Sequence, residues 1–128
     1  MKETAVLDHI GLSVSDFGPS RAFYLKALEP LGMGVVMEGL AVGGGAGFGP
    51  PGKPLLWISQ GAPTTGLHLA FAAGKRAQVD AFYVAAMAAG GRDNGGPGLR
   101  PHYHPNYYAA FVRDPDGNNI EVVCHLPE

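Results

Sequence analysis

Two histidines and one glutamate are the residues whose types and positions most strongly suggest chemistry in this chain of 128 residues. His9 and His68 lie in segments where apolar residues alternate with small or polar ones, and Glu121 lies in a third such segment. Two imidazoles and a carboxylate suit Fe(II), Mn(II), Zn(II) or Ni(II) and leave coordination positions open for a substrate. The sequence therefore predicts a divalent-metal site, in which the metal could polarise a carbonyl group or stabilise an enediolate.

A repeat explains why two of these residues are histidines. Three pairs of identical residues recur at one interval of 59 positions: His9 and His68, Phe23 and Phe82, Gly32 and Gly91. Three matches in one register indicate two copies of one supersecondary unit. We expect a single domain with one unit in about residues 1–62 and the other in about residues 63–128.

Each unit is expected to begin with a strand, continue with a helix and end with short strands. Apolar stripes and Gly signals predict helices from about Pro19 to before Gly32 and from about Lys75 to Ala89. Alternation predicts strands at 6–14, 34–38, 40–43, 55–60, 67–72, 92–100, 107–113 and 119–125. The order predicts an α+β fold of two βαβββ units.

The run Asp114-Pro115-Asp116-Gly117 is a strong signal for a hairpin turn. A three-residue loop there places Phe111 opposite Glu121, which then points away from its apolar neighbours. His9 and His68 also project from the less bulky faces of their strands. We expect a hollow on this face, with Trp57, Tyr103, Tyr107 and Phe111 forming its walls and mouth.

Composition narrows the classes of partner. The net charge of −2 and pI near 6.2 argue against nucleic acid or an anionic membrane. The single cysteine and the lack of a long apolar run predict a cytoplasmic protein. The glycine-rich stretch 43–49 is expected to be a mobile hairpin or lid near the pocket, or a plain surface loop.

Three segments resemble the vicinal oxygen chelate superfamily, which includes glyoxalases, extradiol dioxygenases and bleomycin-resistance proteins. They are Leu7-Asp8-His9-Ile10, Leu67-His68-Leu69-Ala70-Phe71 and Asp114-Pro115-Asp116-Gly117-Asn118-Asn119-Ile120-Glu121. The resemblance implies a curved mixed sheet and metal ligands at His9, His68 and Glu121, with Glu121 also able to carry a proton in catalysis. It further implies a homodimer in which two copies share each site.

The resemblance leaves the reaction open. Glyoxalase I has a fourth ligand where this chain has Trp57, and extradiol dioxygenases have a tyrosine where it has Phe111. Lyase, isomerase or transferase chemistry on a small oxygen-chelating substrate is one expectation, and a dioxygenase-like reaction is another. The alternative is a non-catalytic resistance-type protein that binds a small molecule between Trp57, Phe111 and Tyr107, and a purely structural role is a third possibility.

Overall fold

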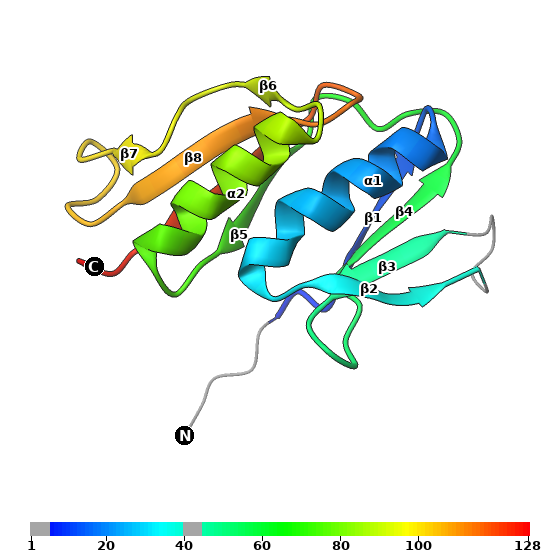
Figure 1. The fold of residues 1–128 in the computed structure, drawn as a ribbon, viewed down its shortest axis with the longest axis horizontal. Helices are drawn as coiled ribbons and strands as arrows, with labels where there is room; N and C mark the ends of the chain where they lie inside the picture. Colours follow the sequence, from blue (N-terminus) through cyan, green and yellow to red (C-terminus); the bar gives the residue numbers. More distant parts are fainter. Residues whose placement is uncertain (1–5, 40–44) are drawn as a thin grey trace.

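Each half of the chain builds one mixed β-sheet with one helix packed against it (Figure 1). The computed structural model describes residues 6–39 and 45–128. The first half contains β1 Ile10–Val14, α1 Phe17–Leu28, a 3₁₀ turn Glu29–Leu31, β2 Gly34–Glu38, β3 Ala46–Gly49 and β4 Leu56–Gln60. The second half contains β5 His68–Ala72, α2 Arg76–Ala88, β6 Arg92–Asp93, β7 Gly98–Leu99, β8 Tyr108–Arg113 and β9 Asn119–Cys124.

The two sheets have corresponding strand orders. The first is β1-β4-β3-β2 and the second is β5-β9-β8-β6, with β7 also paired to β8. In each sheet the first strand of the unit runs parallel to the last, and the other pairings are antiparallel. The predicted α+β class is confirmed, and the hydrogen bonds divide the strands into two sheets. Figure 1 shows α1 and α2 side by side on the same side of these sheets.

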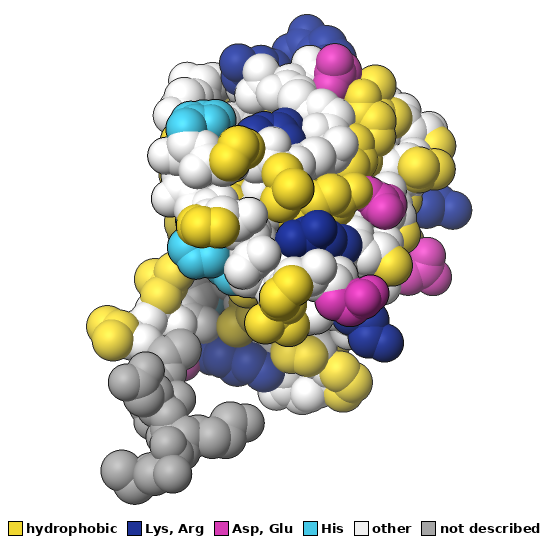
Figure 2. Space-filling view, turned by 90° about the vertical axis from the view of Figure 1, so that its left-hand side faces the viewer, with side chains coloured by type: hydrophobic (Ala, Val, Ile, Leu, Met, Phe, Trp, Pro, Cys, Tyr) yellow, Lys and Arg dark blue, Asp and Glu magenta, His cyan; other side chains and the backbone are white. Residues whose placement is uncertain are grey.

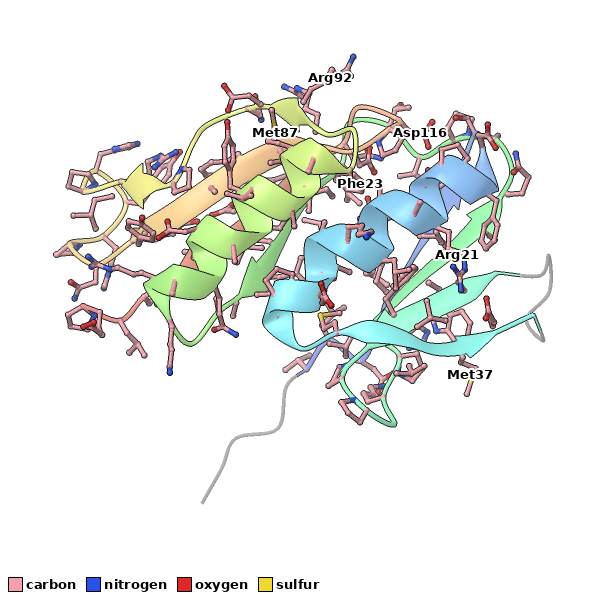
Figure 3. The ribbon with its side chains drawn as sticks, in the orientation of Figure 1. Arg21, Phe23, Met37, Met87, Arg92 and Asp116 are labelled. Carbon is pink, nitrogen blue, oxygen red and sulfur yellow. The ribbon has the colours of Figure 1, made fainter. Side chains whose placement is uncertain are left out.

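The hydrophobic core lies between the helices and the sheet faces turned toward them. Phe23 of α1 is fully buried and lies between the two helices (Figure 3). Other fully buried side chains are Tyr24, Leu28, Phe48, Leu56, Ile58, Val79, Phe82, Val112, Ile120 and Val122. Burying side chains of this size stabilises the fold by about 1.5–3 kcal/mol each. No helix of the described residues is long and apolar enough to cross a membrane.

One expectation about the first half is wrong in part. Residues 46–49, within the stretch expected to be a mobile hairpin or lid, or a plain surface loop, form the buried strand β3, which pairs antiparallel with β2 as one arm of a hairpin would. The glycines permit this close packing, because a Cβ at Gly49 would lie 1.8 Å from the carbonyl oxygen of Lys53. The strand expected at 40–43 lies outside the described residues. In the second half, the strand expected at 92–100 is reduced to the two short segments β6 and β7.

The hairpin between β8 and β9 has the expected register. Phe111 pairs with Glu121, the Asp114 amide donates to the Asn118 carbonyl oxygen at 3.0 Å, and Gly117 has a φ of 87°. The Asp114 carboxylate is buried and accepts hydrogen bonds from the Asn118 amide at 2.8 Å and from the Tyr24 hydroxyl at 2.5 Å. The turn motif is therefore a structural junction that ties α1 to the second sheet.

Candidate metal and substrate site

Glu121 is a buried carboxylate on the sheet face turned away from the helices. Its neighbours Ile120 and Val122 point into the core, so strand alternation turns Glu121 to the opposite face. Its side chain is nevertheless only 1% exposed. A buried carboxylate is costly unless its oxygens are paired. Here Oε2 accepts a hydrogen bond from the Tyr107 hydroxyl at 2.5 Å, and Oε1 lies 2.7 Å from His68 Nε2.

The pair formed by His68 and Glu121 has the chemistry of two neighbouring metal ligands. A zinc ion holds nitrogen and oxygen ligands at about 2.0–2.2 Å in tetrahedral geometry, so adjacent donors around one ion lie roughly 3.3–3.6 Å apart. The observed 2.7 Å between Nε2 and Oε1 is a hydrogen-bond distance, so the two donors would have to separate by several tenths of an ångström to hold an ion. The His68 side chain is 55% exposed, whereas that of Glu121 is 1% exposed, so the pair is open to solvent on the side of His68. These two residues could therefore supply one nitrogen and one oxygen ligand to a divalent ion.

Tyr107 holds the second oxygen of this carboxylate. Burial, followed by its hydrogen bond to Glu121, raises the pKa of the Tyr107 phenol to about 12. The phenol therefore stays protonated at neutral pH and donates to Oε2. The Tyr103 and His125 rings lie edge-on to it, with centroids at 5.0 Å and 5.2 Å. Figure 2 shows histidine side chains along the left-hand edge of the molecule in that view.

His9 occupies a separate position just before β1. Its side chain is 56% exposed, and Nδ1 lies 2.7 Å from Oδ1 of Asp8. Lys53 Nζ contacts the same oxygen at 2.5 Å, and these two hydrogen bonds, with that of Lys53 the larger cause, lower the pKa of the Asp8 carboxyl. A carboxylate on one ring nitrogen orients an imidazole so that its other nitrogen can bind a metal.

The described part of one chain does not assemble the complete predicted ligand set. It contains no group of three His, Cys, Asp or Glu side chains placed to hold a metal ion. His68 and Glu121 are brought together, and His9 is not among them. A pocket of about 220 Å³ between the start of β1 and β5 is lined by His9, Leu55 and Ala70, among others, but by neither His68 nor Glu121.

Trp57 occupies the position in the first sheet that Glu121 occupies in the second. Trp57 pairs with Gly11 across β1 and β4, and Glu121 pairs with Ala70 across β5 and β9. Gly11 and Ala70 are separated by the repeat interval of 59 residues. Trp57 is partly buried over β3, since a Cβ at Gly47 would lie 3.1 Å from its indole ring. In one chain Trp57 lies in the first sheet, whereas Phe111 lies in β8 of the second sheet and Tyr103 and Tyr107 lie in the loop before β8.

The family model for the Glyoxalase/Bleomycin resistance protein/Dioxygenase superfamily matches residues 6–122. The chain belongs to this superfamily. A glyoxalase/bleomycin resistance protein from Albidiferax ferrireducens T118 is 30% identical with a TM-score of 0.76, and the alignment covers 94% of this chain and 98% of that one. The search among curated proteins found no match.

Two solved structures of lower sequence identity share the fold. A family enzyme from Burkholderia phytofirmans PsJN is 22% identical with a TM-score of 0.72, covering 95% of this chain and 100% of that one. A structure named lactoylglutathione lyase from Agrobacterium tumefaciens is 21% identical with a TM-score of 0.63, covering 96% of both chains. At these identities the likeness concerns the fold alone.

Three polar residues of the site region escaped the sequence prediction. Asp8 and Lys53 position His9, and Arg100 places its guanidinium 5.2 Å from the centre of the Phe111 ring. The sequence could have identified Asp8, because it directly precedes the candidate ligand His9. It could also have identified Arg100, because this residue follows the glycine-rich run 95–98 in a segment bounded by strands. No sequence pattern points to Lys53, because its contact with Asp8 depends on how residues distant in the sequence pack.

Proposed function

We propose that this superfamily member is a metal-dependent enzyme acting on a small oxygen-chelating substrate, with lyase, isomerase or transferase chemistry. His68 and Glu121 of one copy and His9 of a second copy would hold the divalent ion, and these ligand types suit Zn, Ni, Mn or Fe. The observation that carries the proposal is the buried Glu121 carboxylate beside the accessible His68. Such an ion, when bound, supplies a Lewis acid for substrate oxygens.

The chain's own residues support proton movement at this position. The Glu121 carboxylate lies on the site face and is the group best placed to accept or return a proton. Tyr107 donates to Oε2, which leaves Oε1 as the oxygen that faces His68. Phe111, opposite Glu121 in the β8–β9 pair, adds an apolar side chain beside the carboxylate.

We propose that a second copy takes part because His9, the third candidate ligand, does not lie beside His68 and Glu121 of its own chain. Asp8 directs the His9 ring, and the His9 side chain is more than half exposed. His68, Ala70 and Ala72 on β5 are likewise exposed on a strand that packs its other face against the core. Association of two copies through these faces would bury them and complete the ligand set.

Metal analysis of mixed dimers tests this arrangement. Purified wild-type protein is expected to take up one ion per chain, and His9→Ala and His68→Ala homodimers are each expected to take up none. A mixed dimer of the two variants contains one intact site if the ligands come from two copies, so it should bind one ion per dimer. It should bind none if each site lies within one chain. Wild-type protein without stoichiometric metal would reject the proposed metal site.

A binding role without catalysis is the second candidate, favoured by the aromatic cluster at the site. The Phe111 ring lies beside His68 with the two centroids 6.2 Å apart, and the Tyr103 and Tyr107 rings pack edge-on against each other at 5.0 Å. Such walls suit a flat apolar ligand. A turnover screen of the metal-loaded protein with thiol adducts of 2-oxoaldehydes, catechols and epoxides separates the two roles. Tight binding of an aromatic compound without turnover supports sequestration.

A further inference from the structure

Asn94 and Gly95 lie in the segment that joins β6 to β7 along the outer edge of the second sheet (Figure 1). This is the one place in the sequence where a glycine directly follows an asparagine. Asn94 is exposed to solvent, whereas Asn106 and Asn119 are partly buried and Asn118 is buried. The asparagine whose next residue lacks a side chain is therefore also the asparagine most open to water.

The packing of this segment requires a glycine at position 95. Its φ of 140° lies in a region that residues with side chains rarely adopt. A Cβ there would also lie 3.1 Å from both the Arg100 guanidinium and the Phe111 ring. The glycine that permits this close packing leaves its own backbone nitrogen without a side chain beside it. Steric hindrance to a reaction at that nitrogen is therefore at its lowest.

The Gly95 nitrogen is held next to a carboxylate that can receive its proton. The Gly95 amide donates to Oδ1 of Asp93 at 3.0 Å, and Asp93 is exposed. The Asn94 side chain is held by one contact at its nitrogen, since Nδ2 donates to Oδ1 of Asn119 at 3.1 Å. A nucleophilic nitrogen, a proton acceptor and an exposed side-chain amide are thus adjacent in the chain.

The pair Asp116 and Gly117 shows how the fold can instead protect such a position. The Gly117 amide donates to the carbonyl oxygen of Asp114 at 2.9 Å inside the turn between β8 and β9. Both carboxylate oxygens of Asp116 accept hydrogen bonds from Ser15, one from its hydroxyl at 2.5 Å and one from its amide at 3.1 Å. An ionised carboxylate also lacks the neutral leaving group that an amide provides. Of the two pairs, the asparagine pair is therefore the reactive one.

We propose that Asn94 is a site of spontaneous deamidation through a cyclic imide formed with Gly95. The Gly95 nitrogen bonds to Cγ of Asn94, the bond from Cγ to Nδ2 breaks, and Nδ2 leaves as ammonia with the proton that Asp93 accepted from the Gly95 amide. Water then opens the ring at one of its two carbonyl carbons. Opening at Cγ gives aspartate, and opening at the main-chain carbonyl gives isoaspartate. This modification does not depend on the proposed metal site.

Either product alters the edge of the sheet beside Phe111. The Asn94 amide donates to the Phe111 carbonyl oxygen at 3.0 Å, and the Phe111 amide donates to the Gly95 carbonyl oxygen at 2.8 Å. Isoaspartate inserts one carbon atom into the backbone between these two hydrogen bonds, so both cannot persist. Aspartate places a second carboxylate directly after Asp93. Because Phe111 pairs with Glu121, the change reaches the neighbour of a candidate metal ligand.

Peptide mapping by mass spectrometry tests the assignment on folded protein kept warm at mildly alkaline pH. The peptide that contains Asn94 is expected to lose its amide progressively and to give an aspartate and an isoaspartate product. The peptides with Asn106, Asn118 and Asn119 should keep their amides over the same period. Asn94→Gln is the matched control, because its longer side chain would have to close a less favourable ring, and its peptide should stay intact.

The same experiment in urea shows what the fold contributes. Asn94 that reacts in the unfolded chain but stays intact in the folded protein would overturn the proposal, as would equal losses at Asn94 and Asn106. Asp93→Ala should slow the reaction in folded protein, and an unchanged rate would contradict proton transfer to that carboxylate.

Thermal unfolding of the separated products tests the effect on the sheet edge. The isoaspartate form should melt about 3–6 °C below Asn94→Gln, because it has lost about one backbone hydrogen bond. An isoaspartate form with an unaltered melting temperature would contradict the loss of pairing with Phe111.

Discussion

Trp57 in the first sheet and Glu121 in the second occupy equivalent positions, yet their surroundings are reversed. The indole lies over Gly47, which has no side chain, whereas the carboxylate lies opposite the large ring of Phe111. Each sheet therefore has one large aromatic side chain in this cross-strand pair, Trp57 on β4 in the first sheet and Phe111 on β8 in the second. The comparison shows that the two repeats fill equivalent positions with similar bulk, while only the second repeat has a carboxylate there.

A second pair of equivalent residues shows the same divergence on the helices. Tyr24 and Tyr83 are separated by the repeat interval of 59 residues. The Tyr24 side chain is fully buried, and its hydroxyl donates to Asp114 in the other half of the chain. Tyr83 donates to the exposed Asp93 within its own half. The first helix is therefore tied to the second sheet, and the second helix has no matching tie through this tyrosine.

Adding one methyl group to the first sheet should produce the largest effect. Gly49→Ala places a Cβ against the Lys53 carbonyl oxygen and should lower the free energy of unfolding by about 3 kcal/mol. Gly11→Ala is the matched control, because a Cβ there meets no atom within 4 Å, and its effect should stay within about 0.5 kcal/mol. Urea unfolding measures both variants. Equal stability of the two variants would contradict the dependence of β3 on close backbone packing.

Substitutions at the equivalent positions Glu121 and Trp57 should have very different effects on metal affinity. Glu121→Gln removes a charged ligand and should weaken metal binding by about 100-fold or more, beyond the 10-fold to 100-fold typical of outer partners. Trp57→Phe preserves an aromatic side chain at the equivalent position and should leave the affinity unchanged. Competition with a chromophoric chelator measures both affinities. A comparable loss in both variants would show that the first sheet also contributes to the metal site.

Removing the two equivalent hydroxyl groups should affect stability unequally. Tyr24→Phe deprives the buried Asp114 of a hydrogen bond to a carboxylate and should cost about 1.5–3 kcal/mol. Tyr83→Phe removes a hydrogen bond to an exposed carboxylate and should cost less than about 0.5 kcal/mol. Thermal and urea unfolding at neutral pH provide the measurement. Similar losses in both variants would mean that burial does not distinguish the two tyrosines.

The smallest expected effect is a change in the titration of Tyr107. Burial is the main cause that raises its pKa to about 12, and the hydrogen bond to Glu121 is the next. Glu121→Gln should therefore lower the Tyr107 pKa, but to a value that remains above 10, because the burial persists. Ultraviolet titration, with Tyr107→Phe to identify the signal, measures the change. Because the pKa is raised in the folded state, this group's contribution to stability should fall as the pH rises from about 10 to about 12. A Tyr107 pKa that is identical in the wild type and Glu121→Gln would contradict the contact.

Local signals in the sequence predicted the elements and the hairpin well. The Asp114–Gly117 turn fixes the register of its own strands, so the position of Glu121 followed from neighbouring residues alone. The strand β3 was missed because alternation cannot be recognised in Ala46-Gly47-Phe48-Gly49, where three of the four side chains are small or absent. The placement of His9 apart from His68 depends on how the two sheets meet, and no local pattern encodes that relation.

The Tyr24–Asp114 hydrogen bond has a consequence for the independence of the two halves. Ser15 makes a parallel connection, as its amide donates to Asp116 of the same turn at 3.1 Å. The first half expressed alone would lack these acceptors, and Asp114 in an isolated second half would lose the hydroxyl that binds it in the interior. The two repeats should therefore unfold together in one cooperative step rather than as separable units.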